Sequence, residues 1–207
     1  MKHKPKIILL FLFLLPIIII FSVSMSSQEK PWTKEMDKNG ITVYLRDYQG
    51  SQLKEFKAQT NVKAPIKSIL NLLTDFKSYP KWVSSNKYTI LLENKNNKDF
   101  IYYTVTKLPK PVDDRDLTVE FIIVESTDTR CFIKTSILPK YVNEKPGIVR
   151  VKQFTGMWEL TKISETETRV ITQCHTEPGG KIPTWITNYL IVKGPYETLE
   201  NMKKMLK

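Results

Sequence analysis

The sequence predicts an α+β domain in which one curved antiparallel sheet of about nine strands is faced by a long C-terminal helix. Three observations lead to this fold class: residues 32–62 read as three strands, residues 87–177 read as six more, and residues 183–206 have a helical period. A sheet this broad, with one amphipathic helix on its concave face, does not fill that face with its own side chains. We therefore expect a hydrophobic cavity beneath the helix.

The first three strands are expected at residues 32–37, 41–48 and 53–62. Asn39-Gly40 joins the first two, and this dipeptide is typical of a two-residue hairpin because both residues tolerate a positive φ. In the third strand, apolar residues alternate with polar ones along the chain. The alternation predicts a sheet with one apolar face.

A helix is expected to begin at Ala64-Pro65, because proline is tolerated in the first turn of a helix. Its inward face is an apolar stripe at the i, i+3, i+4 and i+7 positions, made by Ile66, Ile69, Leu70 and Leu73. Pro80 interrupts the pattern, and a short second helix or turn follows at residues 81–83.

The next six strands are expected at residues 87–93, 100–108, 117–125, 131–138, 148–163 and 168–177. The last segment, residues 183–206, places Trp185, Tyr189, Val192, Tyr196, Leu199, Met202 and Leu206 near one face of a helix. Gly194-Pro195 interrupts this helix. Proline has no N–H for the carbonyl of residue 191, so a kink or a break is expected there.

The first 26 residues have the three-part order of a secretory signal peptide: basic residues 1–6, apolar residues 7–23, then small residues. The apolar run is also close to the lower length limit of a membrane-spanning helix, so an uncleaved anchor remains the alternative. In either case we expect residues 1–26 to be an address and residues 30–207 to form one exported domain, either periplasmic or secreted, and monomeric.

The composition is that of a globular protein, with 41% hydrophobic and 26% charged residues. The formal net charge is +11, and the lysines are spread along the chain. Such a surface is either a soluble lysine-rich surface or one weakly attracted to anionic membranes. We expect no nucleic-acid partner, because no zinc-finger, basic-zipper or RNA-binding signature is present.

The chain has two cysteines, Cys131 and Cys174, each in a candidate strand with apolar neighbours. We favour two buried small hydrophobic residues, with a single disulfide as the alternative. No ligand spacing predicts a metal site, and no cofactor motif is found.

Three motifs occur in a fixed order along this chain of strands: Arg115-Asp116 after Pro109-Lys110-Pro111, then Gly156-x-Trp158, then Gly179-Gly180-x-Ile182-Pro183-x-Trp185. Together they resemble the START (StAR-related lipid-transfer) family over residues 32–207, as an exported member of bacterial type. The resemblance implies the helix-grip fold, shared with Bet v 1-like proteins. It also implies non-enzymatic binding of one sterol, phospholipid or related amphiphile in an internal tunnel.

The polar candidates for contacting a lipid headgroup are Arg115, Asp116, Arg150 and His175. Arg115 offers a fork of donors for a phosphate or carboxylate, but an ion pair between Arg115 and Asp116 that pins a strand is the alternative. Arg150 lines the cavity or is exposed to solvent. His175 is a ligand contact or simply a hydrogen-bonded or exposed residue.

The candidates for the apolar wall of the tunnel are bulky aromatic residues on facing elements: Tyr102, Phe121, Trp158, Trp185 and Tyr189. Ordinary core packing is the alternative for each. Burial of a lipid chain contributes roughly 0.8 kcal/mol per methylene, so such a wall binds tightly without a specific polar contact.

The sequence therefore favours a carrier or sensor of lipids that acts together with a membrane surface. The first alternative is a helix-grip enzyme of cyclase or hydrolase type, and the second is an interaction module with a collapsed cavity. We expect no catalysis, because no serine-histidine-aspartate order and no glycine-rich phosphate loop is present. His175 is also the only histidine after the leader.

Overall fold

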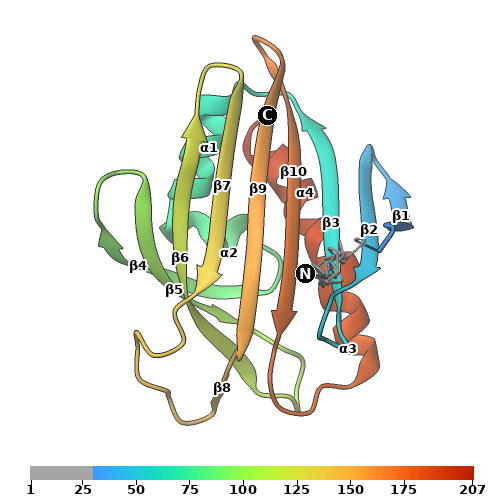
Figure 1. The fold of residues 1–207 in the computed structure, drawn as a ribbon, viewed down its shortest axis with the longest axis vertical. Helices are drawn as coiled ribbons and strands as arrows, with labels where there is room; N and C mark the ends of the chain where they lie inside the picture. The colour runs from blue at the N-terminus through green and yellow to red at the C-terminus, as the bar shows by residue number, and fades with distance from the viewer. Residues whose placement is uncertain (1–29) are drawn as a thin grey trace, which may run out of the picture.

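The computed structural model of the protein describes residues 30–207, so the expected signal peptide or anchor at residues 1–26 lies outside the described residues. Figure 1 shows a curved sheet with its helices gathered on one side. Within residues 30–207, no helix is both long enough and apolar enough to span a bilayer.

The sheet has ten strands in the order β1-β2-β3-β10-β9-β7-β6-β5-β4, and β8 pairs in parallel with β6 off this path. All other pairings are antiparallel. The strands are β1 Thr33–Lys38, β2 Ile41–Asp47, β3 Lys54–Val62, β4 Asn86–Asn94, β5 Asp99–Thr106, β6 Asp114–Ser126, β7 Arg130–Ile137, β8 Ile148–Arg150, β9 Gln153–Ser164 and β10 Glu167–Glu177. The expected antiparallel sheet is confirmed.

Two groups of helices lie on the concave face of the sheet (Figure 1). The first follows β3 and consists of α1 Ile66–Thr74, the 3₁₀ turn η1 Phe76–Ser78 and α2 Tyr79–Trp82. The second follows β10 and consists of α3 Thr184–Asn188, the π-helical segment η2 Tyr189–Lys193 and α4 Gly194–Met205.

The core lies between the concave face and these helices, because strand side chains alternate between the two faces. Ile133, Leu160 and Val170 from the sheet and Leu199 and Met202 from α4 are all fully buried there. α1 contributes Ile66, Ile69, Leu72 and Leu73, and Leu70 is only partly buried. The helix face is thus one position broader than the predicted stripe.

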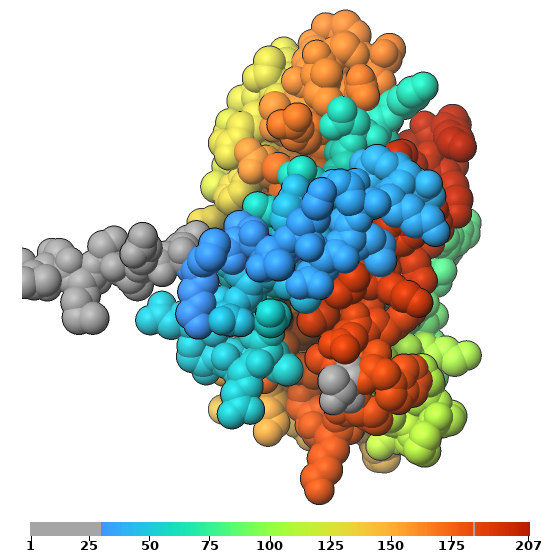
Figure 2. Space-filling model, turned by 90° about the vertical axis from the view of Figure 1, so that its right-hand side faces the viewer, coloured from blue at the N-terminus to red at the C-terminus, as the bar shows by residue number. Residues whose placement is uncertain are grey.

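The turn between β1 and β2 follows the prediction, with φ of 54° at Asn39 and 71° at Gly40. This turn also contacts α4. Asn39 Nδ2 donates to Tyr196 Oη at 2.9 Å and to Glu200 Oε1 at 3.2 Å, and Lys203 Nζ donates to the Asn39 carbonyl at 3.1 Å. Figure 2 shows the β1–β2 hairpin resting against the C-terminal helix. The hairpin therefore holds the C-terminal half of α4 on the sheet.

The segment predicted as one strand over residues 148–163 forms two strands, β8 and β9. The backbone changes partners between them, because the Val151 N–H donates to the Asp116 carbonyl and the Lys152 N–H donates to the Glu177 carbonyl. β8 thus belongs beside β6, whereas β9 lies between β7 and β10. The alternation of apolar and polar residues along the chain does not reveal such a change of strand partner.

The expected interruption at Gly194-Pro195 is present as a widened turn rather than a break. The Gly194 N–H donates to the Tyr189 carbonyl five residues earlier, which is the π-helical pattern. The wider turn tolerates Pro195, which has no N–H to donate, and the helix continues as α4 to Met205.

Cys131 and Cys174 are free thiols, in line with the interpretation favoured over a disulfide; Cys131 is buried and Cys174 is half-buried. Both lie on the concave face, at positions paired with Leu160 and Phe56 respectively. Burial raises the pKa of Cys174 to about 12, so this thiol stays protonated at neutral pH.

Candidate functional site

The middle of the concave face is lined by Tyr102 on β5 and Phe121 on β6, which are 7% and 1% exposed. η1 places Phe76 against both of them, with ring centroids 4.8 Å from Tyr102 and 5.7 Å from Phe121. The ring of Tyr79 lies 5.7 Å from that of Tyr102. The space expected as cavity is therefore occupied here by aromatic side chains of η1 and α2.

Trp158 on β9 is half-buried, and its ring meets Trp82 of α2 edge-on with centroids 6.4 Å apart. Trp82 is 1% exposed, and its indole N–H donates to Ser78 Oγ at 3.3 Å. α2 thus seals the concave face beside the aromatic cluster of Phe76, Tyr79, Tyr102 and Phe121.

Trp185 differs from the expectation, because its side chain is 61% exposed at the surface of α3. Its neighbour Ile186, 1% exposed, takes the inward position instead. Tyr189 on η2 is half-buried and donates to Glu197 Oε2 at 2.7 Å. Of the two aromatic candidates in this helix, only Tyr189 lies beside the interior.

Arg115 and Asp116 do not pair with each other, so the ion pair that was the alternative to a headgroup site is not formed. They are consecutive residues of β6 and so point to opposite faces of the sheet. Arg115 donates to the carbonyls of Asp113, of Pro178 at 3.2 Å and of Gly179 at 3.0 Å. Its role in the fold is to hold the linker between β10 and α3.

The two glycines of this linker adopt positive φ angles, and the second of them lies against Arg115. Gly179 and Gly180 have φ of 68° and 63°, and a Cβ on Gly180 would lie 3.2 Å from Nη2 of Arg115. Burial lowers the pKa of Arg115, but three carbonyl acceptors keep its guanidinium hydrogen-bonded. The Gly-Gly motif and the Arg115 motif are therefore one structural unit.

Asp116 lies on the convex side and binds Arg150, with Nε to Oδ1 at 2.7 Å and Nη2 to Oδ2 at 3.1 Å. It also accepts a hydrogen bond from Tyr103 Oη at 2.7 Å. The Arg150 side chain is 8% exposed and donates to the carbonyls of Pro139, Val142 and Asn143. The expectations for Arg150 are both corrected: it neither lines the concave face nor stands in solvent, but fixes the loop after β7.

His175 is 2% exposed and also lies on the convex face, where its ring stacks on Tyr48 with centroids 3.7 Å apart. Its Nε2 is 3.5 Å from Glu177 Oε1. Among residues 30–207, neither ring nitrogen has a hydrogen-bond partner. The histidine is thus neither exposed nor hydrogen-bonded, and it is remote from the aromatic cluster.

A polar group that the sequence did not single out lies on the concave face, near the start of η2. Asn86 and Thr89 come from β4 and Thr104 from β5, and the three side chains contact one another. Asn86 lines a pocket of about 310 Å³ together with Ser85, Lys107, Leu108, Pro109 and Tyr189. The signal available in the sequence was a threonine at an inward position of each strand, Thr89 in β4 and Thr104 in β5.

A second pocket of about 500 Å³ lies at the C-terminal end of α4, between β2, β3 and β10. Its lining includes Lys63, Arg169, Lys203 and Lys207. The part of the chain that the structure describes contains no group of three or more histidine, cysteine or acidic side chains arranged to hold a metal ion.

A broad antiparallel sheet that closes on a C-terminal helix over an apolar concave face defines the helix-grip class of proteins. The family model of the START domain matches residues 20–207, and the chain belongs to this family. Both the predicted fold and the resemblance are thereby confirmed.

Two relatives illustrate this membership. An uncharacterized protein of Pseudomonas aeruginosa is 30% identical over 184 residues, which cover 89% of this chain and 91% of the relative. The phosphatidylcholine transfer protein of Rattus norvegicus is 26% identical over 178 residues, covering 84% and 82%.

Solved structures agree with this assignment. A STAR-related lipid transfer protein fragment from Xanthomonas axonopodis has a TM-score of 0.77 at 28% identity, covering 84% of this chain and 98% of the fragment. Human StAR-related lipid transfer protein 5 has a TM-score of 0.76 at 16% identity, covering 84% and 86%, and shares the fold.

Proposed function

We propose that this domain binds one lipid between the concave face of the sheet and the C-terminal helices, and carries it between membranes. Membership of the START family supports this proposal, since the rat relative is named a phosphatidylcholine transfer protein and the Xanthomonas fragment a lipid transfer protein. The apolar concave face supports it as well, because each buried methylene of a lipid chain contributes roughly 0.8 kcal/mol.

The observation that carries the proposal is the construction of the helical lid. The second group of helices is one continuous segment over the concave face, but η2 interrupts its regular hydrogen bonding beside the pocket at Asn86 and Tyr189. π-Helical turns are weak points of a helix and occur frequently at functional sites. Lipid uptake begins with movement of α3 and η2 there.

The aromatic cluster must rearrange for a lipid chain to occupy the centre. Phe76 and Tyr79 belong to η1 and α2, two short helical segments after α1. Their backbones are not part of the hydrogen-bonded sheet. We propose that both rings swing away as the chain enters, so that the lipid replaces their contacts with Tyr102 and Phe121.

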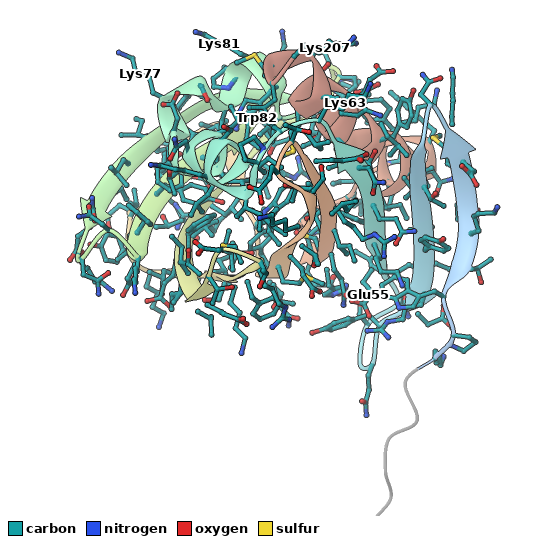
Figure 3. The ribbon with its side chains drawn as sticks, turned by 90° about the horizontal axis from the view of Figure 1, so that it is seen from above. Glu55, Lys63, Lys77, Lys81, Trp82 and Lys207 are labelled. Atoms are coloured by element: carbon teal, nitrogen blue, oxygen red, sulfur yellow. The ribbon has the colours of Figure 1, made fainter. Side chains whose placement is uncertain are left out.

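The lid side of the molecule favours contact with an anionic membrane. Lys63, Lys77, Lys81 and Lys207 are exposed, and Figure 3 shows Lys77, Lys81 and Lys207 projecting on the helix side, away from Glu55. Trp185 adds an exposed indole of the kind enriched at membrane interfaces. We propose an exported protein that meets membranes with this side, held there transiently or by an uncleaved anchor in residues 1–26.

We propose no catalytic role. The only histidine after residue 26, His175, lies on the convex face against Tyr48 and not beside the pocket at Asn86. The rat relative and the Xanthomonas fragment are likewise described as transfer proteins.

The test is native mass spectrometry of the protein purified from its own host, followed by transfer of fluorescent lipid between vesicles. We expect a bound lipid of defined mass, removable with organic solvent, and transfer that increases with protein concentration. Absence of bound lipid, together with no transfer of either sterol or phospholipid, would refute the proposed function.

A further inference from the structure

Asn86, Thr89 and Thr104 form a closed triangle of hydrogen bonds on the concave face. Asn86 Nδ2 lies 2.9 Å from Thr89 Oγ1 and 2.8 Å from Thr104 Oγ1, and the two hydroxyls are 2.8 Å apart. Thr89 and Thr104 are 7% and 8% exposed. Thr104 pairs with Leu117 in the sheet and so shares the face of Phe121.

The number of protons available fixes the orientation of the amide. With the nitrogen toward the threonines, it donates one proton to each; Thr89 donates to Thr104, and Thr104 donates to the Tyr88 carbonyl at 3.4 Å. In the flipped amide, Oδ1 would face the two threonines, and both hydroxyls would donate their protons to it. No proton would then remain for the contact between the two hydroxyls. The threonines therefore require the nitrogen, and Oδ1 faces away from them.

Asn86 Oδ1 is then a buried acceptor without a donor in the described part of the chain. A buried polar atom without a partner costs about 1–3 kcal/mol, and such atoms are rare in folded proteins. The same residue lines the pocket of about 310 Å³ at η2, where Tyr189 and Leu108 are its neighbours in the lining. Oδ1 itself is closed to solvent, so it becomes an acceptor for a ligand that brings a hydrogen-bond donor once the lid above this pocket moves.

The charged groups nearby do not provide a dedicated anion site. Arg115 is occupied by three backbone carbonyls, and Arg150 is bound to Asp116 on the opposite face. Lys107 is the charged residue in the lining of this pocket, and its side chain is exposed to water. An anionic headgroup would find neither a buried cation nor a donor at Asn86 Oδ1.

We infer that this pocket binds the hydroxyl group of a neutral lipid, with the lipid O–H donating to Asn86 Oδ1. The inference rests on the proposed function and names the class of cargo: a diacylglycerol or a sterol. Phosphatidylcholine has no O–H or N–H group and leaves the acceptor unpaired.

The experiment compares each hydroxyl lipid with its methyl ether, which keeps the shape but removes the donor. The probes are 1,2-dioleoylglycerol and its 3-O-methyl ether, cholesterol and its methyl ether, and dioleoylphosphatidylcholine, each measured by competition with a bound fluorescent lipid. We expect the hydroxyl form of one class to bind roughly tenfold tighter than its ether, since one hydrogen bond to a buried acceptor is worth about 1.4 kcal/mol. The lipid class whose hydroxyl form binds more tightly than its ether, diacylglycerol or sterol, is the source of the hydroxyl.

Asn86→Leu should abolish the preference for the hydroxyl form while lipid binding persists. Thr118→Val is the matched control, because Thr118 Oγ1 is equally buried and unpartnered but lies on the convex face. The control should keep the full preference. If Asn86→Leu does not fold, the comparison of hydroxyl and ether on the natural protein still decides.

Equal affinity for hydroxyl and ether in both classes overturns the inference, and so does tighter binding of phosphatidylcholine than of any hydroxyl lipid. Either result leaves the proposed function standing. If no probe binds, the proposed function itself fails.

Discussion

Adjacent charges in a strand serve different parts of this fold. Arg115 secures the linker before α3, whereas Asp116 and Arg150 secure the loop after β7 on the other face. The sequence identified these residues as important but paired them wrongly, because partners distant in sequence decide where a buried charge is satisfied. Arg150 therefore lies outside the expected tunnel, and the guanidinium of Arg115 is occupied by backbone carbonyls.

Replacement of Arg150 tests this assignment. Arg150→Ala leaves Asp116 as a buried carboxylate and releases three loop carbonyls, so we expect a loss of about 3–5 kcal/mol in the free energy of unfolding. Denaturant unfolding measures it. Arg130→Ala is the control, since Arg130 is a half-exposed partner of Glu125 and Glu159 and its loss should be small. A loss at Arg150 no larger than the control's would contradict the assignment.

The aromatic cluster makes a second prediction at this scale. Phe76→Ala should cost about 3–5 kcal/mol of stability, because it opens a void against Tyr102 and Phe121. If a lipid chain occupies the same space, added lipid should restore much of that loss in thermal unfolding. Ile101→Ala, a buried residue of the convex face, should lose stability without recovery. If added lipid restores stability in both variants, or in neither, the lipid chain does not occupy the space of the Phe76 ring.

At the scale of elements, one of the hydrogen bonds between the β1–β2 hairpin and α4 depends on ionised Glu200. Hydrogen bonds from Tyr196, Lys204 and Asn39 lower the pKa of Glu200 from 4.5 to about 2. A carboxyl with a lowered folded-state pKa adds stability above its ordinary pKa and loses it as the pH falls toward the folded value. The hairpin should therefore release α4 progressively between about pH 4.5 and pH 2.

Amide hydrogen exchange of α4 across this range measures the release. Glu200→Gln should flatten the pH dependence of α4 protection. Glu165→Gln, at a carboxylate whose side chain is 87% exposed, should leave it unchanged. An unaltered profile in Glu200→Gln would show that another group controls the contact.

The π-helical turn makes a prediction about the lid. Pro195→Ala restores the missing N–H and allows regular hydrogen bonding across η2, so we expect a gain of up to about 3 kcal/mol in stability. The same change should slow lipid transfer between vesicles, because the lid loses its weak point. Pro80→Ala is the control, because Pro80 lies in the first turn of α2, where proline is tolerated. It should change stability and the rate of lipid transfer less than Pro195→Ala does. Faster transfer by Pro195→Ala would exclude η2 as the point of opening.

For the whole molecule, the sequence predicted the architecture because the alternation of strands and the period of the last helix are local signals. The crossing from β8 to β9 was missed, since residues 151 and 152 change partners only in three dimensions. Trp185 was placed inward, but Ile186 occupies that position. The triangle at Asn86 was missed because a hydrogen-bonding group with one unpaired oxygen is visible only when β4 and β5 are assembled.

The charge of the lid side is a property of the whole molecule. Each lysine near an anionic bilayer contributes about 1 kcal/mol, so Lys77→Glu with Lys81→Glu should weaken binding to phosphatidylserine vesicles by more than about tenfold. Vesicle co-sedimentation at low and high salt measures this, and salt should weaken binding of the natural protein. Lys98→Glu with Lys134→Glu, which changes exposed lysines outside the helix layer, is the control. Equal losses in both double variants would mean that net charge alone attracts the membrane.

The segment from α3 to α4 is fastened at both of its ends. Arg115 grips the carbonyls of Pro178 and Gly179 just before it, and Asn39 contacts Tyr196, Glu200 and Lys203 near its far end. Because both ends are held while η2 interrupts the regular hydrogen bonding between them, we expect the segment to bend at η2 rather than to detach. On the proposed function, the lipid then passes from the side beneath the bent segment. The protein exchanges its lipid without unfolding either end of the segment from α3 to α4.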